Sequence, residues 1–222
     1  FLYSRFSGLL QEMGEDYPKI YLILGNDDPR SEEEKFIRLG TTGVWHYLHS
    51  RKDEFRGFTF YGYANVPPTP FRFKDWERYD VSRYVDPGCM PPEEGFRTMP
   101  PDTDLEFATI KDELAILAGE ELPEKAVFLF HSPPYRTHLD RAALDGMKVD
   151  HVPLDVHVGS IAIQRFIEEK QPWLTMHGHI HEASRITGHW RQLIGSTHAF
   201  TAAWDGPELA LVEFDLEDPA NA

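Results

Sequence analysis

Four side chains of types that bind metals follow apolar segments of the chain. Three of them are histidines and one is an asparagine, and each lies close behind a short apolar run. Neutral imidazole rings and amide oxygens are ligands for borderline metals such as zinc, manganese and iron. The chain therefore contains a candidate metal site whose ligands are far apart in sequence: Asn26, His131, His179 and His181.

The spacing of His179 and His181 adds to this interpretation. On an extended segment, residues two apart face the same side. We therefore expect both rings to serve one ion, or to reach two ions about 3.5–4 Å apart as in two-metal hydrolases. Gly178 is expected to allow an unusual backbone dihedral or a close approach at this point.

Each motif taken alone has an ordinary structural explanation. Gly25 and Asn26 are typical of a turn, and His131 ahead of Ser-Pro-Pro is typical of a loop. The His-Gly-His-x-His segment, taken alone, is as compatible with a chance pattern as with a metal site. The three motifs in this order, each closing a buried strand, favour the metal site.

Short apolar runs must position these side chains. Strands that are buried on both faces and end in polar loops are typical of an open α/β sheet with chemistry at its carboxyl edge. We expect strands over 19–24, 58–63, 126–130, 173–176, 191–194 and 209–214. Helical spacing of apolar residues predicts helices over 1–16, 104–119 and from Ser160 onward.

Residues 66–101 show little periodicity and are rich in proline, glycine and aromatic residues. A segment of that length without regular structure is commonly functional or disordered. It is interpreted either as a lid or substrate wall with apolar contacts from Phe71, Trp76 and Tyr79, or as a packed insert or dimer contact. The packed insert is slightly favoured.

Composition narrows the function classes. The 222 residues suit a single domain, and the net charge of −15 argues against partners such as duplex nucleic acid or an anionic membrane surface. Cys89 is the single cysteine, so no internal disulfide is expected and a reducing compartment fits. We expect a cytoplasmic protein with no membrane span, and a homo-oligomer remains open. The chain does not begin with methionine, so its first residue need not be where translation starts.

The motifs resemble the second half of the calcineurin-like metallophosphoesterase signature. The resemblance lies in Gly25-Asn26-x-Asp28, in His131, and in Gly178-His179-Ile180-His181, which together span most of the chain. The phrases over 66–71 and 157–160 also resemble members of this family. The combination is specific, whereas no single motif is.

The resemblance implies a fold and a chemistry. The implied fold is a four-layer α/β/β/α sandwich that holds two divalent metal ions, of manganese, iron, zinc or nickel. Asn26, His131 and His179 would bind the second ion, and His181 the first. The implied activity is hydrolysis of a small-molecule phosphate ester, a diester in preference to a monoester, by attack of metal-bound hydroxide on phosphorus.

One departure from the family pattern is large. The family begins with Asp-x-His and Gly-Asp motifs, and neither precedes Gly25 here. Those motifs supply the first ion's ligands and the bridging carboxylate. We therefore expect a βαβ segment ahead of Phe1 that this chain does not contain.

A second departure is chemical. Many family members have histidine directly after the asparagine, where this chain has Asp27. A carboxylate beside metal ions is a poor proton donor. We expect either a preference for diesters with good leaving groups or recruitment of another acid, for which His157 is the candidate because it precedes a helix start suited to phosphate. Arg136 and His138 are candidate phosphate contacts, and for all three the alternative is an ordinary loop residue.

Two other functions compete with the enzyme. A non-catalytic scaffold on the same fold would suit the missing N-terminal ligands and the loss of the histidine after Asn26. The intact ligand positions argue against it. A mononuclear zinc hydrolase of another fold would need a carboxylate ligand that the sequence does not indicate. The five remaining histidines are interpreted as structural: His46, His49, His177, His189 and His198.

Overall fold

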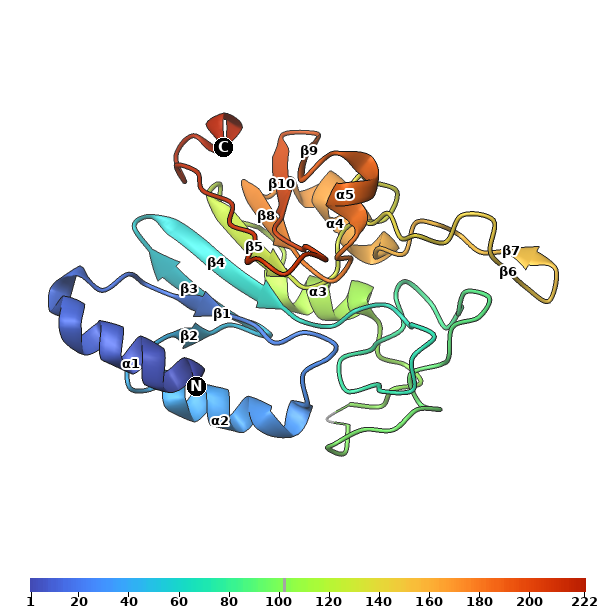
Figure 1. Cartoon of the computed structure of the whole chain (residues 1–222), viewed down its shortest axis with the longest axis horizontal. Helices are drawn as coiled ribbons and strands as arrows, with labels where there is room; N and C mark the ends of the chain where they lie inside the picture. The colour runs from blue at the N-terminus through green and yellow to red at the C-terminus, as the bar shows by residue number, and fades with distance from the viewer. Residues whose placement is uncertain (102) are drawn as a thin grey trace.

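A mixed six-stranded sheet forms the centre of the computed structural model, which describes residues 1–101 and 103–222 (Figure 1). Its strand order is β3-β4-β5-β8-β10-β9, and the four inner strands are parallel to one another. Both edge strands pair antiparallel with their neighbours. The six strands are β3 (Arg51–Phe55), β4 (Phe58–Tyr63), β5 (Ala126–Phe130), β8 (Leu174–His177), β9 (Arg191–Ile194) and β10 (Thr197–Thr201).

Two helices cover one face of this sheet. Helix α3 (Ile110–Ala118) begins at Thr109, whose side chain accepts the Asp112 N–H, and α4 (Ile161–Lys170) begins at Ser160 in the same way. Such side-chain caps satisfy backbone donors that the first helical turn leaves free. Alternate strand residues such as Tyr61 and Phe128 pack with both helices in one buried cluster.

The opposite face packs on a second, smaller sheet. Strands β1 (Tyr21–Leu22) and β2 (His46–Tyr47) pair in parallel, and the Tyr21 ring stacks on Phe60 at 4.5 Å between centroids. Beyond them lie α1 (Leu2–Met13) and α2 (Glu33–Gly40), which contact Trp45 through aromatic rings. Leu48 and Val127 belong to the core cluster on this side.

The remaining elements are short. They are the strands β6 (Lys148–Val149) and β7 (Val152–Pro153), the helix α5 (Ala183–Thr187), and the 3₁₀ turns η1 (Gly14–Asp16), η2 (Arg30–Glu32) and η3 (Pro219–Asn221). Across the described residues, the longest helix is α1 with 12 residues, and no helix has both the length and the apolar character needed to cross a membrane.

The sequence prediction located most inner elements and missed several short ones. The strands expected over 58–63, 126–130 and 191–194 are present, and so is the helix after Ser160. The strand expected over 19–24 has only two ladder residues, and the helix expected over 104–119 begins at Ile110. Four short strands (β2, β3, β6 and β7) and β10 were not predicted, because they carry few apolar residues or only a weak alternation.

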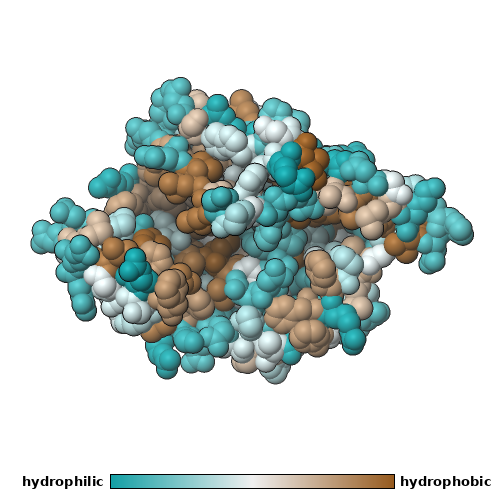
Figure 2. Space-filling model, viewed as in Figure 1, coloured by the Kyte–Doolittle hydropathy of each residue, from teal (hydrophilic) through white to brown (hydrophobic). Residues whose placement is uncertain are grey.

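The strand predicted over 209–214 is wrong. Residues along it alternate between exposed and half-buried, and Val212 and Phe214 pack against the cluster around Phe200. No ladder joins this segment to another strand among the described residues. On the face of the molecule that Figure 2 shows, apolar surface lies in the hollow near the centre. The alternation of residues indicates which side of the segment packs on the core. A ladder also needs a neighbouring strand with a free edge.

The segment over 66–101 is a packed insert. It contains no helix or strand, as expected, yet Trp76 and Tyr79 are almost completely buried. The lid interpretation is therefore wrong for these two rings, because a buried ring cannot form a wall for a ligand. Phe71 is exposed. Buried Lys74 and Glu77 form an ion pair at 2.6 Å inside the insert.

Two buried histidines make the fold sensitive to acid. Burial lowers the pKa of His49 to about 3 and that of His177 to about 4. In an unfolded chain both rings would be protonated below about pH 6.5. In the folded protein they stay neutral to a lower pH. Their contribution to stability is therefore complete above pH 6.5 and is lost as pH falls towards 4.

We expect His177→Gln to show a weaker pH dependence of stability than the wild type. As the pH falls from 7 to 5, the unfolded chain takes up a proton at each of these histidines, which should lower the free energy of unfolding by about 2 kcal/mol per histidine. Urea denaturation of both proteins at the two pH values measures the difference. Equal pH dependences in the two proteins would contradict the assignment.

Candidate functional site

The amide oxygen of Asn26 lies at the meeting point of two histidine rings. Its Oδ1 is 2.7 Å from Nε2 of His131 and 2.8 Å from Nδ1 of His179. The two rings themselves lie 5.1 Å apart between centroids. Three of the four predicted metal ligands, separated by 105 and 153 residues in the chain, therefore present their donor atoms to one point.

A tight turn after β1 presents Asn26. The Asp28 N–H donates to the Gly25 carbonyl at 3.0 Å, and the Gly25 N–H donates to the Asp28 carboxylate at 2.8 Å. The packed insert supports this turn from outside. The Trp76 indole donates to the Asp28 carbonyl at 2.7 Å, and Asp75 accepts the Arg30 N–H at 2.7 Å.

Asp27 orients the Asn26 amide. The Asn26 Nδ2 donates to the Asp27 carboxylate at 3.1 Å. With its nitrogen directed there, the amide turns its oxygen to the histidines. Asp27 itself is exposed and lies close enough for its charge to favour protonation of His131. The structure thus places Asp27 at the site, as a neighbour of a ligand.

His131 lies against two glycines. A Cβ at Gly25 would be 2.6 Å from Cε1 of the His131 ring, which no real contact allows, whereas a Cβ at Gly178 would be at an ordinary 3.4 Å from Nδ1. The Gly178 N–H also donates to the His131 carbonyl at 3.0 Å. The residue that must be glycine is therefore Gly25, and the expected role of Gly178 is not required. A glycine directly before a ligand is the signal that could have found it.

His179 adopts a backbone conformation that is rare for a residue with a side chain. Its φ is +71°, and the Ile180 N–H donates to the Gly178 carbonyl at 2.9 Å across it, which makes a γ-turn. Strained backbone of this kind is concentrated at functional sites. The prediction of an extended His-x-His segment is therefore wrong, because the chain turns at His179.

The fourth predicted ligand, His181, makes none of these contacts in the described structure. His181 is exposed, and none of the hydrogen bonds found among the described residues joins it to Asn26. Its charge still influences His131 and His179, lowering the pKa of both. His181 thus lies close enough for its charge to act on both rings, and its role as a ligand stays a prediction.

Both central rings are held neutral. Burial lowers the pKa of His131 to about 4 and, together with the neighbouring histidines, that of His179 to about 3. A neutral imidazole has the lone pair that metal binding needs. Protons therefore compete weakly for these two nitrogens at neutral pH.

Gly25→Ala is expected to damage the site through the His131 ring. The added methyl would overlap that ring, which would have to leave its place beside Asn26. We expect Zn²⁺ affinity to fall by roughly 10- to 100-fold, as when groups that orient a ligand are changed. Titration calorimetry measures it. Gly178→Ala is the matched control, and a loss of affinity as large in that variant would contradict the prediction.

Other predicted contacts lie in the loop after β5. The Arg136 guanidinium lies over the Tyr135 ring at 5.3 Å, and the His138 ring stacks on His189 at 4.3 Å. Both residues are exposed. The His157 Nδ1 donates to the Asp140 carboxylate at 2.8 Å. Neither Arg136 nor His138 has a hydrogen bond or ring contact with the three converging ligands in the described part of the chain.

The helix start behind His157 is already occupied. Asp80 of the insert accepts the N–H groups of Ile161 and Ala162 at 2.6 and 3.2 Å, and the Ser160 hydroxyl at 2.5 Å. The expectation that this helix start holds a phosphate is therefore wrong, since a carboxylate fills it. His157 remains a candidate on the strength of its own contacts.

The histidines expected to be structural are accounted for in part. His177 bridges β8 to the loop after β5, with Nδ1 3.0 Å from the Ser132 carbonyl and Nε2 2.8 Å from the Thr175 hydroxyl. His49 accepts the Ala64 N–H at 3.0 Å. Both are buried and lie in the core, as predicted.

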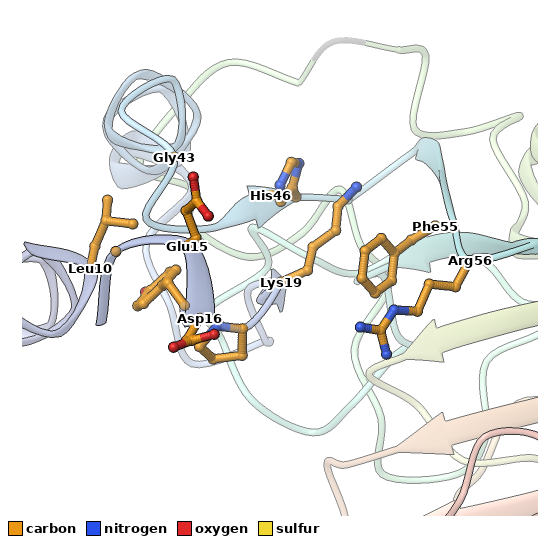
Figure 3. A pocket seen from close by; sticks show the side chains of 11 residues that line it. Leu10, Glu15, Asp16, Lys19, Gly43, His46, Phe55 and Arg56 are labelled. Atoms are coloured by element: carbon orange, nitrogen blue, oxygen red, sulfur yellow. The ribbon is translucent and has the colours of Figure 1, made fainter. Parts of the chain in front are cut away.

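A separate hollow of about 770 Å³ lies between the end of α1 and the turn after β3. Charged residues line it, among them Glu15, Lys19 and Arg56, and the Phe55 ring lies between Lys19 and Arg56 (Figure 3). Lys19 is engaged with Asp53 at 2.6 Å. None of the predicted site residues lines this hollow.

Within the described residues, no group of three or more His, Cys, Asp or Glu side chains is arranged to hold a metal ion. The set that converges at Asn26 contains only two histidines, and its third donor is an amide oxygen, so it is not a group of this composition. It offers three donors, all of them neutral.

Comparison with known proteins yields likeness of fold alone. No protein-family model matches the chain, and no curated protein matches its sequence. One solved crystal structure matches with a TM-score of 0.51 at 17% identity, over 91% of this chain and 64% of that one. Another, the crystal structure of TT1561 of Thermus thermophilus, matches with a TM-score of 0.48 at 13% identity, over 91% of this chain and 70% of that one. This chain thus spans less than two thirds of the length of the first.

Proposed function

We propose that this chain carries the catalytic half-site of a metal-dependent phosphoesterase, acting on a phosphodiester. The convergence of Asn26 Oδ1, His131 Nε2 and His179 Nδ1 within 2.7–2.8 Å carries the proposal. Two imidazole nitrogens and an amide oxygen that meet at one point form a set of donors suited to a metal ion. The resemblance of the three motifs to the calcineurin-like metallophosphoesterases points to the same function.

The three donors fit one divalent ion of the borderline class. They comprise an amide oxygen and two imidazole nitrogens, and burial keeps both rings neutral. Bound there, such an ion would supply Lewis-acid chemistry: it polarises a phosphate oxygen and lowers the pKa of water. It would also attract an anionic substrate to a protein whose net charge is −15.

The chain's own residues would hold the ligands of this ion in place and orient them. Asp27 keeps the Asn26 amide oxygen turned inwards, and the slot beside Gly25 holds the His131 ring. His181, beside the three donors, is the candidate ligand for a second ion. The remaining ligands of that ion are not found in the motifs of residues 1–222.

The order of packing supports the four-layer sandwich. Helices α3 and α4, the six-stranded sheet, the β1–β2 sheet, and the helices α1 and α2 follow one another through named contacts. The proposed layering is the one that the metallophosphoesterase resemblance implies. It would bring the ligand loops to one edge, where the strands end.

Metal content and activity of the full-length protein test the proposal together. We expect bound divalent metal by elemental analysis, two equivalents per chain, and hydrolysis of bis(p-nitrophenyl) phosphate that rises with added Mn²⁺. Absence of both metal and activity would reject the enzyme and favour the non-catalytic scaffold. Bound metal without any hydrolysis would also reject it.

Asp27 is expected to set the leaving-group preference. A carboxylate beside metal ions donates protons poorly, so p-nitrophenolate should leave far more readily than an alkoxide. We expect Asp27→His to narrow this difference, measured as the slope of log kcat against leaving-group pKa. Glu34→His, which replaces an exposed carboxylate of α2, is the control for an added imidazole. An unchanged slope in Asp27→His would count against this role.

A further inference from the structure

A buried carboxylate organises the loop behind His131. Asp140 has no exposed surface and accepts the N–H groups of Arg136, Thr137 and Gly159 at 2.9, 3.0 and 3.2 Å. Its fourth partner is the His157 ring, whose Nδ1 lies 2.8 Å from Oδ1. His157 is therefore the one ring that this buried group engages among the described residues.

The contact determines how His157 faces its surroundings. An ionised carboxylate has acceptors only, so Nδ1 must carry a proton and donate it to Asp140. In a neutral ring the lone pair then lies on Nε2, at the far side. The His157 side chain is 30% exposed, so part of the ring is accessible to a ligand.

Neighbouring contacts hold the ring in place. The Tyr135 ring meets His157 edge-on, at 6.2 Å between centroids and 78° between planes. The Tyr135 hydroxyl donates to Asp155 at 2.6 Å, and the Asp155 carboxylate also accepts the His157 N–H at 2.9 Å. The ring is thus held from its backbone, from one nitrogen and from one edge.

Both ligand-bearing loops adjoin this pair. The Ser160 N–H donates to the Pro133 carbonyl at 2.9 Å, which ties the end of the 157–160 segment to the loop that follows His131. Val158 packs in the cluster that contains Ile180, the residue between His179 and His181. The His157 segment therefore lies against the two loops that carry the histidine ligands.

We propose that Asp140 is a positioning residue that fixes the His157 tautomer, so that Nε2 faces the phosphate ester and serves its leaving group. This inference rests on the proposed function. Asp140 touches no substrate itself and acts through the ring. The arrangement follows the general pattern in which a buried carboxylate orients a working imidazole.

Protons and electron pairs balance in this step. The oxygen of a water molecule bonds to phosphorus as the bond from phosphorus to the leaving oxygen breaks. The leaving oxygen keeps the electron pair of that bond and takes the proton of a protonated His157 from Nε2. Having given up this proton, the ring is neutral and keeps its Nδ1–H hydrogen-bonded to Asp140. Nε2 then regains a proton from solvent, which also receives the proton lost by water.

Nuclear magnetic resonance tests the geometry without reference to activity. Long-range proton–nitrogen correlation spectra, recorded where the ring is neutral, show which nitrogen carries the proton. We expect the Nδ1–H form of His157 in the wild type and a shift towards Nε2–H in Asp140→Asn, whose amide can donate. An Nε2–H wild type would overturn the proposal, even if the variant fails to fold.

Kinetics test the consequence. We expect kcat for an alkyl phosphodiester to fall 10- to 100-fold in Asp140→Asn and in His157→Gln, with no further loss in the double variant, at unchanged KM. Bis(p-nitrophenyl) phosphate, whose leaving group needs no proton, should respond little. Asp145→Asn removes an exposed carboxylate from the same loop, paired with Arg141 at 2.5 Å, and should change neither rate.

The two failures can be told apart. Additive losses in the double variant, or equal losses on both substrates, would indicate a merely structural role for Asp140 and overturn the proposal. A wild type without metal or hydrolysis would reject the proposed function and the catalytic part with it. The tautomer of His157 would still report whether Asp140 orients the ring.

Discussion

Replacing His131 with alanine is expected to remove bound divalent metal and to lower phosphodiester hydrolysis by roughly 10³-fold. His131 Nε2 is one of the two ring nitrogens that lie within 2.8 Å of Asn26 Oδ1, and its loss would leave two of the three donors. A loss of about 4 kcal/mol of transition-state stabilisation corresponds to that factor. Elemental analysis and kcat/KM on bis(p-nitrophenyl) phosphate measure the two effects.

The control must remove an imidazole that lies elsewhere. His189 is exposed and stacks on His138, without contact to Asn26 in the described structure. His189→Ala should keep both metal and activity. Circular dichroism of the two variants shows whether the fold is intact. Retention of metal by a folded His131→Ala protein would refute the assignment of this ligand.

Lys74→Met is expected to cost about 3–5 kcal/mol of stability, because it leaves a buried carboxylate without its cation. Lys74 and Glu77 have 0% and 1% of their surface exposed, and their charged groups lie 2.6 Å apart. Burial already raises the pKa of Glu77 above its ordinary value, and Lys74 opposes that rise. Urea denaturation at neutral pH gives the free energy of unfolding.

The double variant Lys74→Met/Glu77→Leu separates the missing charge from the missing contacts. Replacing both partners of a buried pair with apolar residues is often close to neutral. Thr69 would then lose the carboxylate that accepts its N–H at 3.0 Å and its hydroxyl at 2.5 Å, so we expect partial recovery. A cost below about 1 kcal/mol for the single variant would contradict the argument.

The Lys74–Glu77 ion pair also connects the stability of the fold to the candidate metal site. Trp76 lies between Lys74 and Glu77 in sequence, and its indole holds the Asp28 carbonyl of the turn that presents Asn26. Loosening the insert should therefore weaken metal binding as well as the fold. A folded Lys74→Met protein with unaltered Zn²⁺ affinity would show that the turn does not depend on the insert.

The amino-acid sequence by itself determined most of the inner elements and which side chains are candidate ligands. The apolar runs of β4 and β5 are recognisable because a strand buried on both faces needs apolar side chains at nearly every position. Asn26, His131 and His179 are recognisable because each follows such a run. Residue type and order along the chain carry this information locally.

Weak local signals left other elements undetected. Strand β3 reads Arg-Lys-Asp-Glu-Phe and is a strand only because β4 lies alongside with a free edge. Residues 209–214 have the alternation of a strand without a ladder. In both cases the outcome depends on whether a strand edge lies alongside, which the segment's own residues do not reveal.

Tertiary structure alone decided how the site is built. The need for glycine at position 25 comes from the His131 ring, which is far away in the sequence, and the turn at His179 breaks the alternation that would have paired it with His181. The contact between Asp140 and His157, on which the proposed positioning role rests, joins residues that are 17 positions apart. Spacing predicts which side chains carry chemistry, but distances between loops depend on how the sheets and the insert pack, and that packing is a property of the whole chain.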